Sequence, residues 1–192
     1  MTARWVVDEV APHRDLNVVW QPISLMFKND VEPDAEHYPA VLATHRMLRV
    51  MEAIRAEHGD AAVQRWYLLA GATVHHDGER DTADLAAMVE HLGFDAKLAE
   101  AADDDTWDAE IRRRMDIGLE LAGNDIGTPI IALDNADGER QAYFGPVITR
   151  VPPGDLSLKL WDALTAMMDV PGFWELKRTR TESPEFGDRP DI

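Results

Sequence analysis

Cysteine is absent from all 192 residues of the chain. The sequence can therefore form no disulfide bond and supplies no thiolate nucleophile. Positive charge is also scarce, because 19 Lys and Arg residues stand against 36 Asp and Glu residues, for a net charge of −17. Such a charge repels phosphate backbones and anionic lipid surfaces, so we expect no nucleic-acid partner.

Long apolar runs are missing as well. The run at residues 130–133 is typical of the chain, whereas a membrane-spanning helix needs about 20 apolar residues. No membrane partner is therefore expected. The first ten residues contain Arg4, Asp8 and Glu9, which do not fit a secretory signal. Together with the lack of cysteine, this favours a cytoplasmic protein.

The rest of the composition is typical of a globular protein, with 45% hydrophobic and 29% charged residues. Residues 3–10 place Trp5 and Val10 on one helical stripe, and Pro12 ends it. Residues 16–25 have strand composition. Between residues 36 and 123 the apolar residues recur at helical spacing, which predicts four or five helices. The candidate N-caps of these helices are Asp60, Asp81 and Asp105.

The carboxyl-terminal third returns to strand at Pro129. Proline has no amide N–H, so at the first position of a strand it marks a special turn, and one such turn contains a cis peptide bond. A turn at residues 134–138 leads to a second strand, and a last helix follows from Asp155. Residues 175–180 are expected to dock the carboxyl end onto the domain, and the polar residues from Thr179 onward to form a loose tail.

Seven short motifs, in this order, resemble those of a known family. They are Thr2-Ala3-Arg4-Trp5, Ile23-Ser24-Leu25 leading to Asn29, Val74-His75, Gly127-Thr128-Pro129, Tyr143-Phe144-Gly145-Pro146-Val147, Lys159-Leu160-Trp161-Asp162, and the ten residues from Phe173 to Glu182. The whole chain resembles the DsbA-like thioredoxin-fold oxidoreductases with a helical insertion. It is most similar to their mycothiol-dependent nitroreductase branch.

The resemblance implies an α/β, thioredoxin-like fold whose first strand is missing. Residues 1–30 and 125–192 would form a discontinuous, incomplete thioredoxin-like domain, and residues 31–124 an inserted α-helical domain. Members of the family carry a strand and a Cys-Pro-x-Cys motif shortly before the Thr-x-Arg-Trp motif. Here Met1 stands directly before that motif. We therefore expect an N-terminal truncation, with the first strand and both redox cysteines encoded upstream of Met1.

The resemblance also implies a substrate-binding site but no catalytic residue, because the redox cysteines are absent. A cis bond between Thr128 and Pro129 would expose the Thr128 backbone to a substrate thiol or peptide. Asn29 and Tyr38 would line the substrate pocket and hydrogen-bond a nitro group or the carboxylates of a thiol cofactor. His75 would lie beside the active-site groove and influence a thiolate.

Each of these residues also has a purely structural interpretation. Pro129 can occupy a turn with a trans bond, Asn29 can be a turn residue, and Tyr38 can simply begin a helix. His75 can lie at an exposed helix end. With His76 and Asp77 it lacks the ligand spacing of a metal site, so no metal is expected.

Three functions follow from this reading. The first is a thiol-disulfide or mycothiol-dependent oxidoreductase, with mycothiol as co-substrate and no bound cofactor, which would be inactive without its cysteines. The second is a redox-inert binding module of thioredoxin-like fold. The third is a thiol-dependent isomerase of the related glutathione-type branch. In each case the partner is a small thiol or disulfide, and the resemblance also allows a homodimer.

Overall fold

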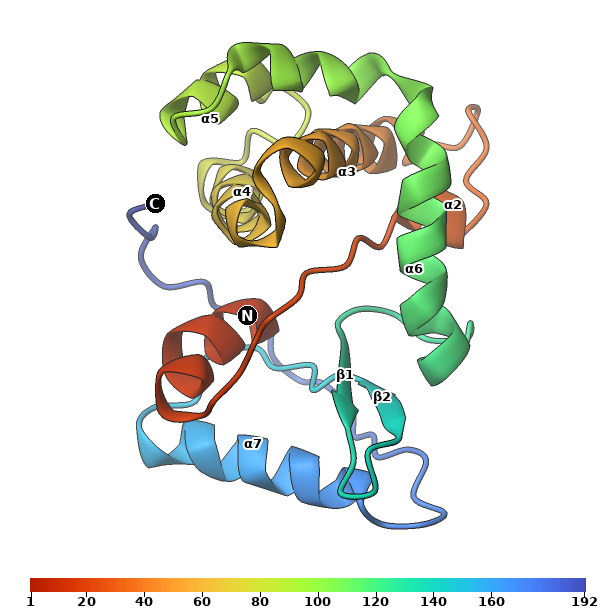
Figure 1. Cartoon of the computed structure of the whole chain (residues 1–192), viewed down its shortest axis with the longest axis vertical. Coiled ribbons are helices and arrows are strands. Elements are labelled where there is room, and N and C mark those ends of the chain that lie inside the picture. Colours follow the sequence, from red (N-terminus) through yellow and green to blue (C-terminus); the bar gives the residue numbers. More distant parts are fainter. The chain divides into compact units, whose positions relative to one another are not determined.

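Helices make up most of the regular structure, and the sheet has only two strands. The computed structural model describes residues 1–192 and divides into two units, each built from segments distant in the sequence (Figure 1). Unit 1 comprises Met1–Val18 and Ile117–Gly187, and unit 2 comprises Val19–Asp116 and Asp188–Ile192. The protein is therefore a mixed α/β structure in which helices dominate.

Unit 1 begins with a continuous helical segment, which confirms the helix expected at residues 3–10. It consists of α1 (Thr2–Arg4), the π-helical η1 (Trp5–Val10) and the 3₁₀ turn η2 (Ala11–His13). Trp5 and Val10 are fully buried. The helical stripe therefore faces the core of unit 1, as its spacing predicts.

A hairpin forms the sheet of unit 1. Strands β1 (Ile130–Asp134) and β2 (Arg140–Phe144) pair antiparallel, with Ile131 opposite Tyr143. The connecting turn is held by the Asn135 side chain, whose Oδ1 accepts hydrogen bonds from the amides of Asp137 and Glu139 at 3.1 and 2.8 Å. Such Asn-centred turns are local in sequence, and the predicted hairpin is confirmed.

Helix α7 (Asp155–Met168) completes the core of unit 1. Its Trp161 and Leu164 pack with Trp5 and Val10, and the two indole rings lie 5.9 Å apart. The Trp5 indole N–H donates to the carbonyl of Ser157 at 3.2 Å. A buried Trp needs such a partner, so this bond fixes how the first helical segment meets α7.

The strand expected at residues 16–25 is not formed. Residues 15–24 have no regular secondary structure, and a one-turn helix, α2 (Leu25–Lys28), begins where the strand was expected to end. A strand exists only when a neighbouring strand pairs with its backbone groups. Because the sheet contains β1 and β2 alone, strand composition was not sufficient here.

Unit 2 is built on two long helices that lie side by side (Figure 1). Helices α3 (Tyr38–His58) and α4 (Asp60–Ala72) are joined at Gly59, whose φ of 78° is a conformation that favours glycine. Val50 and Ile54 of α3 and Trp66 of α4 are buried in one apolar cluster. A π-helical turn, η3 (Thr73–Asp77), extends α4.

The remaining helical elements of unit 2 follow in sequence order. They are α5 (Leu85–His91), the 3₁₀ segments η4 (Ala96–Asp103) and η5 (Asp105–Trp107), and α6 (Asp108–Ala122), which contains the boundary between the units. The N-caps of α5, η4 and η5 are Asp84, Asp95 and Asp104. The N-cap of α4 is Gly59. All three candidate caps, Asp60, Asp81 and Asp105, were therefore wrong by one to three residues.

Residues 169–192 contain no helix or strand, but the last residues of this tail make specific contacts. The Glu185 amide donates to the Thr149 carbonyl at 2.7 Å, and Arg189 pairs with Asp77 at 2.8 Å within unit 2. Before these contacts in the sequence, Trp174 and Leu176 are 85% and 81% exposed. The docking expected of residues 175–180 is therefore wrong, since the residues after them make these contacts.

None of the helices combines the length and the apolar character that crossing a membrane requires.

Candidate functional site

The segment before β1 presents free backbone groups at the surface of unit 1. The Thr128–Pro129 peptide bond is cis, and Thr128 is exposed. The Pro129 carbonyl accepts a hydrogen bond from the Gly145 amide at 2.8 Å, whereas the amide and carbonyl of Thr128 have no hydrogen-bond partner. Thr128 therefore offers one donor and one acceptor, next to a position that the hairpin holds in place.

The opposite side of this hairpin end is also anchored. The Gly145–Pro146 bond is cis, and the Pro146 carbonyl accepts a hydrogen bond of 2.7 Å from the hydroxyl of buried Thr2. Thr2 begins the first helical segment, so the end of β2 is tied to the amino terminus of unit 1. The Pro129 segment is therefore bound to the Gly145–Pro146 segment, which is bound in turn to the first helical segment.

The other predicted site residues lie on three separate elements of unit 2. Asn29 is exposed and forms the C-cap of α2. Tyr38 is half-buried and is the first residue of α3, while His75 is exposed within η3. These positions agree with the structural interpretation of each residue.

A series of hydrogen-bonded side chains runs from Ser24, the N-cap of α2, to residues of α3 and α6. Ser24 Oγ lies 2.9 Å from Nδ1 of His45, and Nε2 of His45 lies 3.0 Å from Oδ1 of Asp108. Both Ser24 and His45 are 1% exposed. Arg49 completes the chain, because its Nε and a terminal nitrogen donate to the two Asp108 oxygens at 2.7 and 2.8 Å.

The hydrogen-bond pattern fixes where the protons lie. Burial lowers the pKa of His45 below its usual value, although Asp108 partly opposes this, so the imidazole is neutral near pH 7. Burial alone would raise the pKa of Asp108, but hydrogen bonds from Arg49 and His45 hold it below its usual value. The Asp108 carboxylate only accepts, which assigns the imidazole proton to Nε2 and leaves Nδ1 to accept from the Ser24 hydroxyl.

Serine, histidine and aspartate stand in the order found in hydrolase triads. Ser24 is nevertheless closed to solvent, and its Oγ already accepts the Phe27 amide proton at 3.2 Å. A nucleophile must be reachable by its substrate. The chain is therefore a support for α2 and not a catalytic triad.

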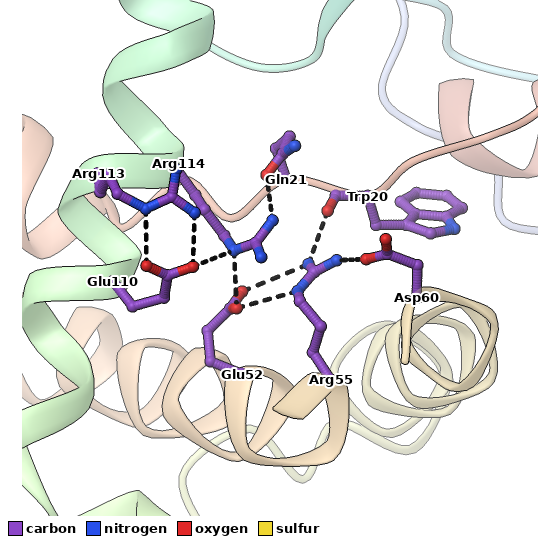
Figure 2. A network of polar contacts seen from close by, with 8 residues as sticks. All are labelled: Trp20, Gln21, Glu52, Arg55, Asp60, Glu110, Arg113 and Arg114. Atoms are coloured by element: carbon purple, nitrogen blue, oxygen red, sulfur yellow. Dashed lines mark hydrogen bonds and ion pairs between the residues drawn. The ribbon is translucent and has the colours of Figure 1, made fainter. Parts of the chain in front are cut away.

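A second buried network joins α3 to α6 within unit 2, as Figure 2 shows. Glu52, which is 2% exposed, accepts from Arg55 at 2.9 Å and from Arg114 at 3.1 Å. Arg114 also donates to Glu110 at 2.7 Å, and Arg55 donates to the Trp20 carbonyl at 2.7 Å. The two arginines thus bind Glu52 from two helices and reach the segment before α2.

Glu110 is a more exposed carboxylate of this network, and its pKa is strongly lowered. Arg113 donates to both Glu110 oxygens at 2.7 Å and lowers the pKa of Glu110 to about 2. Arg55 also pairs with Asp60 at the start of α4. All of these charges have partners, and the network therefore stabilises unit 2 without offering an open binding position.

A model of the Rv2466c-like family, described as "Mycothiol-dependent nitroreductase Rv2466c", matches residues 1–178. The chain belongs to the Rv2466c-like family. A relative in this comparison is the uncharacterized protein Rv2286c of Mycobacterium tuberculosis (strain ATCC 25618 / H37Rv), which is 27% identical over 183 residues, or 94% of this chain and 76% of the relative. The family assignment points to mycothiol-dependent oxidoreductase activity.

The family assignment covers both the Thr128–Pro129 segment and the buried chain behind α2. The sequence motifs predict the first of these but not the second. His45 lies among the apolar residues that recur at helical spacing in α3, and an imidazole buried there must have hydrogen-bond partners. That requirement was the available signal, but Ser24 and Asp108 lie 21 and 63 residues away in the sequence.

No group of three or more His, Asp or Glu side chains is arranged to hold a metal ion. The Asp77 carboxylate of the His75-His76-Asp77 run is bound instead by Arg189, at 2.8 to 3.0 Å. Two open hollows of about 360 and 490 Å³ lie in unit 2, and no predicted site residue lines either of them.

Proposed function

We propose that this member of the Rv2466c-like family binds mycothiol, or a disulfide of mycothiol, at Thr128 and takes part in mycothiol-dependent redox chemistry. The observation that carries the proposal is the exposed Thr128 backbone, whose donor and acceptor are both unused. A cysteine-derived thiol has amide groups that can pair with both, in the manner of an added strand. The mycothiol dependence comes from the family's description.

The proposed fold supports this site. We infer that unit 1 is a DsbA-like, thioredoxin-like arrangement in which β1, β2 and α7 follow one another as strand, strand and helix. Pro129 stands directly before β1, and its carbonyl is held by Gly145 at 2.8 Å. The segment that would meet the thiol is thus attached to the most regular part of unit 1.

The chemistry must take its sulfur from the co-substrate, because the chain has no cysteine. A thiolate is the nucleophile in thiol-disulfide exchange. Two mycothiol thiols can reduce a nitro group to a nitroso group, which forms one mycothiol disulfide and releases one water molecule. The protein would bind and orient a thiol in this reaction and would not form a mixed disulfide with it.

Substrate recognition in unit 2 would fall to Asn29, Tyr38 and His75. An amide, a phenol and an imidazole can each hydrogen-bond a nitro group or a carboxylate. Asn29 and His75 are exposed, and Tyr38 is half-buried, so all three can be reached from solvent. Their assignment rests on the resemblance of their motifs to the nitroreductase branch.

The lack of cysteine also favours a second candidate. A redox-inert binding module, or a thiol-dependent isomerase, needs no protein thiolate. These alternatives differ from the first in their stoichiometry. An oxidoreductase consumes two thiols for each nitro group reduced to nitroso, an isomerase consumes none, and a binding module turns over nothing.

Calorimetric titration with mycothiol and with mycothiol disulfide tests the proposal. Thr128→Pro removes the amide N–H, whereas Thr128→Ser keeps it and serves as the matched control. We expect the first change to weaken binding about tenfold, the effect of losing one good hydrogen bond, and the second to leave it unchanged. Equal affinity of Thr128→Pro and the wild type, or no binding of either ligand by the wild type, would reject the site.

A further inference from the structure

We propose that His45 is a positioning residue that holds Asn29 in place through Ser24 and helix α2. The inference deepens the proposed function, since it rests on the assignment of Asn29 to substrate recognition. Its structural content is independent of any ligand. A buried chain of side chains that runs from α6 through α3 to α2 sets the position of the exposed Asn29 amide.

Helix α2 is too short to hold its own shape. It has four residues, and helices of one turn are unstable without outside contacts. Its first turn is closed by two bonds to Ser24: the Phe27 amide donates to Oγ at 3.2 Å, and the Lys28 amide donates to the carbonyl at 2.8 Å. The Asn29 amide then bonds to the Leu25 carbonyl at 3.2 Å. Whatever fixes Ser24 therefore fixes Asn29.

His45 is the group that fixes the Ser24 side chain. Its Nδ1 accepts the Ser24 hydroxyl at 2.9 Å, and this leaves the lone pairs of Oγ free to accept from Phe27. On the other side its Nε2 is held by Asp108, which Arg49 binds with two bonds. Every donor in the chain has one acceptor, so the order of the hydrogen bonds is determined.

Aromatic contacts hold the same turn from two directions. The Phe27 ring meets the His45 ring edge-on at 4.5 Å, and the Arg112 guanidinium lies 3.5 Å above the Phe27 ring. His45 belongs to α3 and Arg112 to α6. Helix α2 is thus held by both helices, and Asn29 follows it directly at the surface.

Position 45 requires a side chain that forms hydrogen bonds, and not only one of the right volume. A leucine at position 45 would fill a similar space but would leave the Ser24 hydroxyl and one Asp108 oxygen without this partner. Unpaired buried groups favour a local rearrangement that restores hydrogen bonds to water. The segment most easily rearranged is the single turn of α2, because its neighbours α3 and α6 are long helices.

Two substitutions separate the two bonds of the imidazole. The amide of His45→Asn reaches the place of Nδ1 and keeps an acceptor for Ser24, whereas the amide of His45→Gln reaches the place of Nε2 and keeps the bond to Asp108. Thr44→Ala is the control, since the Thr44 hydroxyl bonds only to Ala40 and Val41 carbonyls of its own helix region.

Amide hydrogen exchange measured by NMR gives the first readout. We expect His45→Gln to speed exchange at Phe27 and Lys28 about tenfold, while His45→Asn stays within about threefold of the wild type. Exchange at Trp66 in the core should be unchanged in every variant, which checks that the fold is intact. Equal protection at Phe27 in the wild type and His45→Gln would overturn the positioning role.

Calorimetric titration with 4-nitrobenzoate, which carries both a nitro group and a carboxylate, gives the second readout. Asn29→Ala should weaken binding about tenfold, His45→Gln about threefold or more, and the double variant no more than Asn29→Ala alone. Additive losses would show that His45 acts by another route and would overturn the inference. If Asn29→Ala has no effect while Phe27 exchange still responds to His45→Gln, the substrate role of Asn29 fails and the control of α2 by His45 stands.

Discussion

The hydroxyl oxygen of Ser24 lies 2.9 Å from Nδ1 of His45, and neither side chain reaches solvent. This contact requires a neutral imidazole with its proton on Nε2, where Asp108 accepts it at 3.0 Å. Protonation of His45 would place a second proton opposite the Ser24 hydroxyl. The stability of unit 2 should therefore depend on pH in a defined direction.

The first prediction concerns that pH dependence. Burial lowers the pKa of His45 in the folded state, while Asp108 raises it and Arg49 and Arg112 lower it. The unfolded chain keeps a His pKa of about 6.5, so it binds more protons than the folded chain just below that pH. We expect the contribution of His45 to the free energy of unfolding to be constant above about pH 7 and to fall below about pH 6.5.

Urea denaturation at a series of pH values measures this effect. His45→Gln should make the slope below about pH 6.5 shallower, because glutamine does not titrate, while His75, whose pKa burial also lowers, still contributes. His37→Gln, which changes an exposed histidine just before α3, is the control and should keep the slope. An unchanged slope in His45→Gln would show that His45 is not the titrating group.

The second prediction contrasts two carboxylates of the network in Figure 2. Glu52→Gln removes the buried charge that Arg55 and Arg114 share, and loss of one partner of a buried ion pair costs about 3–5 kcal/mol. Glu110→Gln removes a more exposed partner of Arg113 and Arg114, for which a loss below about 1 kcal/mol is typical. Denaturant titration compares the two.

If Glu110→Gln cost more stability than Glu52→Gln, solvent would have to screen the ion pairs of Glu52 as well. The carboxyl group of Glu110 can be followed by NMR titration. Its pKa of about 2 keeps it ionised down to about pH 3, as the hydrogen bonds from Arg113 require.

The sequence correctly predicted the elements that depend on residues close to one another along the chain. The helical stripe with Trp5 and the Asn135 turn depend on residues a few positions apart, and both were confirmed. The strand at residues 16–25 needed a partner strand that the sheet does not contain. The His45 chain was missed because Asp108 reaches it only through the packing of α6 on α3, which periodicity does not describe.

The contrast between local and long-range contacts also applies to the tail at residues 169–192. Its family-like motif from Phe173 to Glu182 gave no information on which of its residues touch the domain. Phe173 is held, since its carbonyl accepts from the Tyr143 hydroxyl at 3.2 Å, but the next residue, Trp174, is 85% exposed. The sequence predicted docking at residues 175–180, whereas in the structure the hydrogen bonds at Phe173 and Glu185 hold the tail.

The third prediction follows from that exposure. Trp174→Ala and Leu176→Ala should change the free energy of unfolding by less than about 0.5 kcal/mol, as exposed substitutions do. Trp161→Ala, at 5% exposure in the core of unit 1, should cost about 3–5 kcal/mol. Chemical denaturation followed by circular dichroism compares these variants. A loss above about 1 kcal/mol for Trp174→Ala would show that its side chain packs against the protein in solution.

The fourth prediction links the first helical segment to the proposed thiol site. The Thr2 hydroxyl donates to the Pro146 carbonyl at 2.7 Å, and the adjacent Gly145 amide holds the Pro129 carbonyl. Thr2→Val keeps the volume and removes only the hydrogen bond, at a cost of about 1–3 kcal/mol. If this anchor holds the Thr128 backbone in its binding position, mycothiol affinity should fall as well. Thr165→Val on α7, whose hydroxyl bonds only to its own helix, is the control for both measurements. If Thr2→Val lost stability but kept its affinity for mycothiol, the Thr2–Pro146 hydrogen bond would have no role in binding.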